Sequence, residues 1–175
     1  MGTTTILGYF REAADLVQTF SLDFIIIAVT FAVLFLLSMR SGKGTTITLI
    51  FSFYVGLLTY LHFPYIERFL FFTETETQLF LSNAIVFLAF VIISYVTLSR
   101  VVYADFSEKT PTRLLEAGLL SAAATLLLLS FSYQILPVTT LYNFGAPVDS
   151  LFEPSNLFFL WLMIPLVIVI LTTRR

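Results

Sequence analysis

Residues 77–99 read TQLFLSNAIVFLAFVIISYVTLS and contain no Asp, Glu, Lys or Arg. A helix needs about 20 predominantly apolar residues to cross a bilayer. Hydrocarbon holds no water to pair with the backbone, so only helices and closed barrels can span it. A barrel strand would alternate apolar and polar residues, and this run does not alternate. Residues 77–99 therefore predict a membrane-spanning helix.

The composition of the whole chain is also that of a membrane protein. Of its 175 residues, 58% are hydrophobic and 11% are charged, against roughly 25% charged in a typical soluble domain. Such a composition excludes a soluble enzyme and a disordered chain. The net charge of -2 offers no basic surface for nucleic acid. The absence of cysteine excludes disulfides and thiolate metal sites.

Further uncharged runs lie on both sides of this stretch. We expect an all-α integral membrane protein, a single membrane domain with five transmembrane helices at about residues 22–40, 45–63, 78–99, 115–136 and 156–173. The last span contains Pro165, which removes one helical hydrogen bond. Neighbouring helices in a bundle can compensate for that loss. The alternative for this segment is a re-entrant or interfacial helix.

The segment before the first span has a different pattern. Its apolar residues fall on one side of a helical wheel: Ile6, Tyr9, Phe10, Ala13, Leu16, Val17 and Phe20. Residues 6–20 therefore predict an interfacial amphipathic helix that lies along the membrane. The alternative is one long helix over residues 6–39.

The basic residues predict the orientation. Seven of the nine fall on one side if all five segments cross: Arg40, Lys43, Arg100, Lys109, Arg113, Arg174 and Arg175. Loops rich in Lys and Arg stay in the cytoplasm. We therefore expect the N-terminus outside and the C-terminus inside the cell. With four crossings, the last two arginines would face outward.

The same side carries the residues that we expect to contact anionic lipid headgroups: Arg40, Lys43, Arg113, Arg174 and Arg175. The turn RSGKGT at residues 40–45 superficially resembles a phosphate-binding loop, but Leu37 stands where the first glycine is required. We interpret Gly42 and Gly44 as residues that let the chain reverse between two spans.

Small residues are concentrated in AGLLSAAAT, residues 117–125. They recur at intervals of four, a spacing that lets helix backbones approach closely in a membrane. The residues predicted to pack helices are Ala117, Gly118, Ser121, Ala122 and Thr125. A leucine at position 118 or 122 should push a neighbouring helix outward.

No constellation of chemically active residues is evident. His62 is the only histidine and is interpreted as a polar cap at a span end. The alternating acids and hydroxyls of residues 73–76 favour a solvated loop or helix start over a calcium site. Asp23, Arg40, Arg100 and Glu116 are span-boundary residues. We therefore expect no catalytic residue, no cofactor and no metal.

Three short motifs follow one another along the first two thirds of the chain. LDFIII opens the first span at residues 22–27, RSGKG forms a basic turn at residues 40–44, and RLLEAGLL occupies residues 113–120. This order resembles the colicin V production protein family of small bacterial inner-membrane proteins. The resemblance covers residues 22–137, and the span at 156–173 lies beyond the shared four-helix core. It implies a bacterial inner membrane and a role in envelope maintenance or export.

Together these features predict a non-enzymatic envelope or export factor, or an accessory subunit of a larger membrane assembly. Its expected partners are the lipid bilayer and other membrane subunits or further copies of itself. The alternative is a small oligomeric transporter or channel, which usually carries ionisable groups inside its spans. A lipid-modifying enzyme would need a polar cluster at one depth of the membrane.

Overall fold

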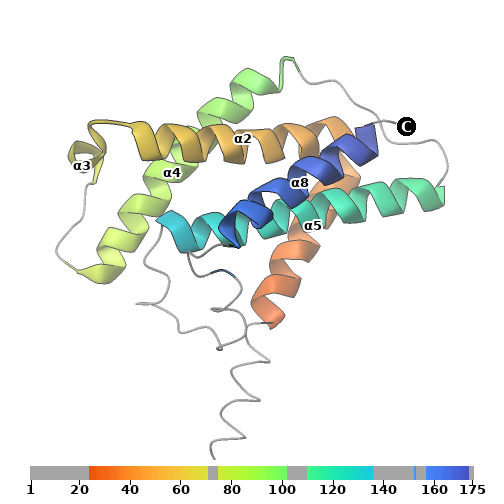
Figure 1. The fold of residues 1–175 in the computed structure, drawn as a ribbon, viewed down its shortest axis with the longest axis horizontal. Coiled ribbons are helices and arrows are strands. Elements are labelled where there is room, and N and C mark those ends of the chain that lie inside the picture. The colour runs from red at the N-terminus through yellow and green to blue at the C-terminus, as the bar shows by residue number, and fades with distance from the viewer. Residues whose placement is uncertain (1–23, 71–74, 102–109, 136–151, 153–156, 174–175) are drawn as a thin grey trace, which may run out of the picture.

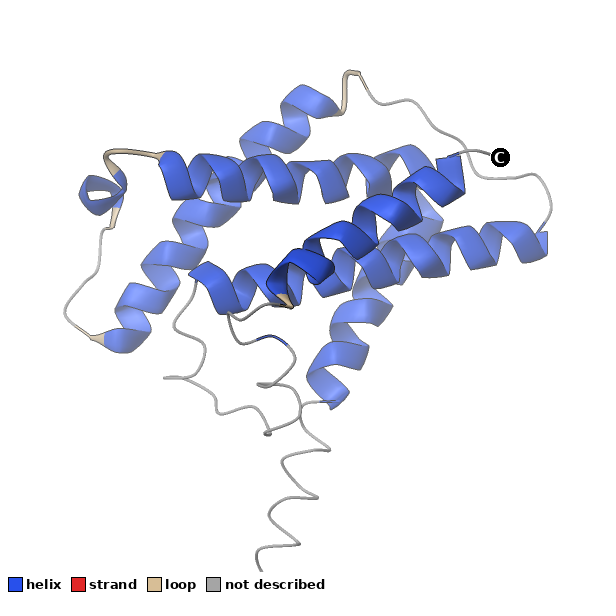
Figure 2. Ribbon diagram, in the orientation of Figure 1, coloured by secondary structure: helices blue, strands red, loops and turns tan. Residues whose placement is uncertain are grey.

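The computed structural model describes residues 24–70, 75–101, 110–135, 152 and 157–173, and helix is the only regular secondary structure within them. The all-helical prediction is confirmed for this part of the chain (Figures 1 and 2). The helices are the first described helix (Phe24–Ser41), α2 (Lys43–His62), α3 (Ile66–Phe69), α4 (Glu76–Leu98), α5 (Thr110–Ile135) and α8 (Phe158–Thr173).

Four of these helices are long and apolar enough to cross a membrane: the first described helix, α2, α4 and α5. They coincide with the first four expected spans. Helix α8 has 16 residues, which at 1.5 Å each extend about 24 Å, less than the roughly 30 Å of hydrocarbon. Its length therefore does not establish the fifth crossing. The predicted interfacial helix at 6–20 lies outside the described residues.

Helix α5 is the centre of the bundle. It packs against α2 and α8, while α4 packs against the other side of α2. Helices α2 and α5 run in the same direction and α8 runs in the opposite one (Figure 1). Of the apolar part of α5, 61% is buried, against 6% in the first described helix. The core includes Ile50, Leu120, Leu127 and Phe131.

A single glycine separates the first two helices. Gly42 has a φ of 92°, a backbone conformation that residues with a Cβ atom rarely adopt. Its N–H donates to the Ser38 carbonyl at 3.0 Å, which ends one helix, and α2 begins at the next residue. Gly44 does not share this role. It lies in the first turn of α2, where its carbonyl accepts a hydrogen bond from the Thr48 hydroxyl.

Helices α2 and α4 approach each other closely at Gly56. A Cβ placed on Gly56 would lie 2.7 Å from Val91 Cγ2 and 3.3 Å from Val91 Cα. Thr48, Ser52 and Gly56 follow one another at intervals of four and are all buried. This is the small-residue spacing that permits close packing in membranes, and it occurs on α2 as well as in the stretch singled out from the sequence.

Helix α8 contains a proline close to a contact with α2. Pro165 has no N–H, so it cannot donate the helical hydrogen bond to the carbonyl of Trp161, four residues earlier. The Tyr54 hydroxyl of α2 donates to the adjacent Leu162 carbonyl. A neighbouring helix therefore bonds to the backbone of this turn.

The two ends of the bundle differ in chemistry. We call them the Lys43 end, where α2 begins and α8 ends, and the His62 end, where α2 ends. At the His62 end the Phe63 ring lies 5.3–6.1 Å from the rings of Tyr65, Phe69 and Phe90. Tyr and Trp concentrate where a membrane protein meets the headgroups, and Tyr65 is the one residue of this cluster with such an amphipathic ring.

Candidate functional site: a buried ion pair at one end of the bundle

One ion pair joins three helices at the Lys43 end. Lys43 is the first residue of α2, and its Nζ lies 3.0 Å from Oε2 of Glu116 in α5. The same ammonium donates to the carbonyl of Thr172 in the last turn of α8. The two charged side chains are only 6% and 7% exposed. The pair therefore links α2, α5 and α8 inside the protein.

The geometry is electrostatically favourable. The carbonyl end of a helix carries partial negative charge, and a cation there is stabilising. The Lys43 ammonium lies at the carbonyl end of α8, and the Glu116 carboxylate neutralises the charge of that ammonium. Removing either partner would leave the other buried and uncompensated, which costs far more than the net contribution of the intact pair. This arrangement fixes helices relative to one another.

This placement does not fit the lipid contact expected for Lys43. Its side chain turns into the bundle, where a carboxylate and a helix C-terminus both attract it. Arg40 and Arg113 are exposed at the same end, and Arg113 Nη2 donates to the Met39 carbonyl at 3.2 Å. Arg174 and Arg175 lie outside the described residues. Lipid contact at Arg40 and Arg113 stays a prediction.

The small residues of α5 divide into two faces. Ala117, Ser121 and Thr125 are buried, and the two hydroxyls donate to carbonyls one turn earlier in α5. Gly118 and Ala122 are only half-buried. A Cβ on Gly118 would lie 4.0 Å from Phe35 Cε2, an ordinary contact. Gly118 therefore does not mark a close helix approach, unlike Gly56.

The remaining polar candidates have local structural roles. His62 is exposed, and its Nδ1 lies 3.0 Å from the Leu58 carbonyl in its own helix. Thr75 caps α4, since its hydroxyl accepts a hydrogen bond from the Gln78 N–H. Within the described residues no three His, Cys, Asp or Glu side chains come together in a way that could hold a metal. Glu74 lies outside those residues.

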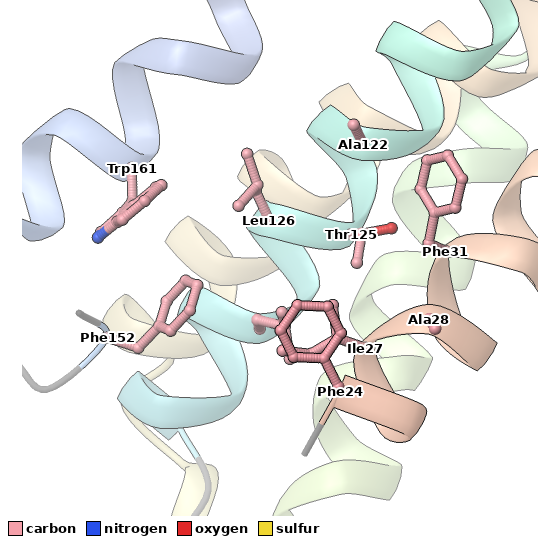
Figure 3. A pocket seen from close by; sticks show the side chains of 10 residues that line it. Phe24, Ile27, Ala28, Phe31, Ala122, Thr125, Leu126, Phe152 and Trp161 are labelled. Atoms are coloured by element: carbon pink, nitrogen blue, oxygen red, sulfur yellow. The ribbon is translucent and has the colours of Figure 1, made fainter. Parts of the chain in front are cut away.

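A second feature is an apolar cavity of about 440 Å³ between the first described helix, α5 and α8 (Figure 3). Thr125 is its one hydroxyl-bearing residue, and Trp161 and Phe152 border it with rings stacked 5.1 Å apart. The lining residues are Phe24, Ile27, Ala28, Phe31, Ala122, Thr125, Leu126, Leu129, Phe152 and Trp161.

Sequence reasoning did not bring Lys43 and Glu116 together. Both were assigned to the ends of spans, and charges there ordinarily point to water or headgroups. The local sequence carried no signal of the pair, because Glu116 is flanked on its helix by Arg113, Leu119 and Leu120 and lies 73 residues from Lys43.

No family model, curated protein or solved structure matches this chain. The resemblance to the colicin V production family therefore depends on the three short motifs alone.

Proposed function

We propose that this chain is a non-enzymatic protein of the bacterial inner membrane that acts as an envelope or export factor, or as an accessory subunit of a larger membrane assembly. The observation that carries the proposal is the apolar face of α4. Its outward residues Leu81, Ile85, Leu88 and Ile92, here called the α4 seam, are each between 47% and 55% exposed.

The α4 seam has the spacing of a helix-packing interface. Leucine and isoleucine alternate at intervals of four, three and four residues, the heptad pattern whose side chains insert between those of a facing helix. On its other side α4 packs against α2 through the Gly56 contact. Helix α4 is therefore packed on one side and presents the seam on its exposed side.

The proposal includes five crossings, with the N-terminus outside and the C-terminus in the cytoplasm. Two observations support it. Helix α8 runs opposite to α5, and its last turn lies at the Lys43 end, where Arg40 and Arg113 are exposed. A span of about 24 Å can be accommodated by local thinning of the bilayer or by snorkelling of flanking arginines.

Affinity purification in mild detergent tests this function. We expect a second membrane protein, or a second copy, to co-purify with the wild-type chain in fixed stoichiometry. Replacing the four residues of the α4 seam by alanine should abolish this association. A matched variant removes the same number of exposed apolar side chains from the first described helix: Ile25, Val29, Val33 and Leu36. That variant should retain the partner.

A small transporter or channel is the second candidate, and the Lys43–Glu116 pair favours it. Ionisable groups inside a membrane bundle often mark a pathway for ions or protons. The two candidates differ in purified liposomes. A transporter would show proton or ion flux that increases with protein density and disappears in Lys43→Met. The leading proposal expects no flux in either protein.

A further inference from the structure

The first described helix and α5 form a wedge that is closed at the Lys43 end. There Arg113 donates to the Met39 carbonyl, and Phe35 makes ordinary contact with the surface of Gly118. Toward the start of the first described helix the two helices separate (Figure 1). The 440 Å³ cavity occupies this wider part, and Trp161 of α8 borders it (Figure 3).

Two helix faces line the wedge. Positions 24, 27, 28 and 31 belong to one, and positions 122, 125, 126 and 129 belong to the other. Both follow the spacing of a single helix face. These are surfaces of the type that normally pack directly together, yet here a cavity separates them. The smallest lining side chains, Ala28 and Ala122, belong to opposite faces and leave that space open.

The cavity offers water almost no hydrogen-bond partners. Its one hydroxyl, on Thr125, already donates to the Ser121 carbonyl at 2.8 Å. An ordered water needs two to four polar partners, and the lining offers almost none. The space opens at the surface of the bundle, and its apolar lining favours an apolar occupant.

Size and surroundings decide the kind of occupant. A helix is about 10 Å across with a pitch of 5.4 Å, so one helical turn already matches the 440 Å³ of this space. A hydrocarbon chain is narrower and can lie along the wedge. Two of the bordering helices are candidate membrane spans, so the opening between them meets lipid.

We propose that this wedge binds one hydrocarbon chain of a membrane lipid. The chain fills the space between the first described helix and α5 and contacts Phe31, Leu126 and Leu129. It thereby holds in place a helix of which only 6% is otherwise buried. This inference does not depend on the proposed function, because a lipid site of this kind fits an accessory subunit and a transporter equally.

Photo-crosslinking in liposomes tests the site. The probe is phosphatidylcholine with a diazirine in one acyl chain, and mass spectrometry maps the labelled residues. We expect labelling of the wedge residues to exceed that of Val29 and Leu36, which are exposed on the first described helix outside the wedge. Ala122→Phe and Ala28→Phe, which fill the wedge from either side, should each reduce wedge labelling about tenfold, equivalent to about 1.4 kcal/mol.

Val33→Phe is the matched control, because it adds the same ring to an exposed position that does not line the wedge. It should leave labelling unchanged. Circular dichroism identifies any variant that fails to fold, and either wedge variant alone is sufficient for the test. Labelling in proportion to exposure over all helices would overturn the proposal. So would wedge labelling that persists in a folded Ala28→Phe or Ala122→Phe protein.

Discussion

The ammonium of Lys43 lies 3.0 Å from Oε2 of Glu116, a residue 73 positions later in the chain. Since Lys43 also donates to the Thr172 carbonyl, this one side chain links α2, α5 and α8. The pair is buried, so its two members are expected to behave as a unit.

Lys43→Met and Glu116→Gln should each destabilise the protein by about 3–5 kcal/mol, because each leaves a buried charge without its counter-ion. The double variant Lys43→Met/Glu116→Leu should recover most of that loss. Denaturant unfolding in detergent micelles measures all three. If both single variants prove as stable as the wild type, the pair does not join the helices as described.

A charge swap separates the pair from its surroundings. Lys43→Glu/Glu116→Lys restores opposite charges but brings a carboxylate close to the C-terminal carbonyls of α8, where negative charge is unfavourable. We expect the swap to remain less stable than the wild type. A swap as stable as the wild type would show that the contact with the Thr172 carbonyl contributes nothing.

Gly56→Ala should cost about 1–3 kcal/mol, since its Cβ would lie 2.7 Å from Val91 Cγ2 and 3.3 Å from Val91 backbone atoms. Gly118→Ala should be tolerated, because its Cβ would lie 4.0 Å from the nearest side-chain atom. Thermal unfolding in the same detergent compares the two. The reverse order of stabilities would contradict the packing described for α2 and α4.

Tyr54→Phe removes the donor to the Leu162 carbonyl beside Pro165. Hydrogen bonds between membrane helices contribute about 0.5–1.5 kcal/mol, and we expect a loss in that range. Tyr60→Phe is the control, as its hydroxyl has no hydrogen bond among the described residues. Equal losses from both tyrosine variants would show that the Leu162 contact is not specific.

Topology is accessible to thiol chemistry because the chain has no cysteine. An impermeant maleimide should label Cys at Glu76 in intact cells, but Cys at Arg100 or Arg175 only after permeabilisation. Labelling of residue 175 from outside, with residue 100 protected, would mean that α8 does not cross.

The helices were predictable from sequence because an uncharged apolar run of about 20 residues is sufficient to define a membrane span. Residues 77–99 and 45–63 needed no tertiary information. The contacts were not predictable in the same way. The four-residue spacing identified the small residues on α5, but it did not show which helix each of them contacts. The sequence therefore predicted a close helix approach at Gly118, whereas the structure has one at Gly56.

The ion pair escaped prediction for a related reason. A lysine next to a turn is ordinarily solvated, and only the three-dimensional arrangement brings a carboxylate and a helix C-terminus within its reach. Burial of Lys43 depends on α5 and α8 together, and neither is near it in sequence.

The central claim is that this protein works through assembly, and complementation of a deletion strain tests it most directly. The alanine variant of the α4 seam should fail to complement and should lose the complex on a native gel, with normal membrane levels. His62→Ala and Glu76→Gln should complement fully. Loss of function in either of these two variants, with the complex intact, would contradict the account, as would full function of the seam variant as a monomer.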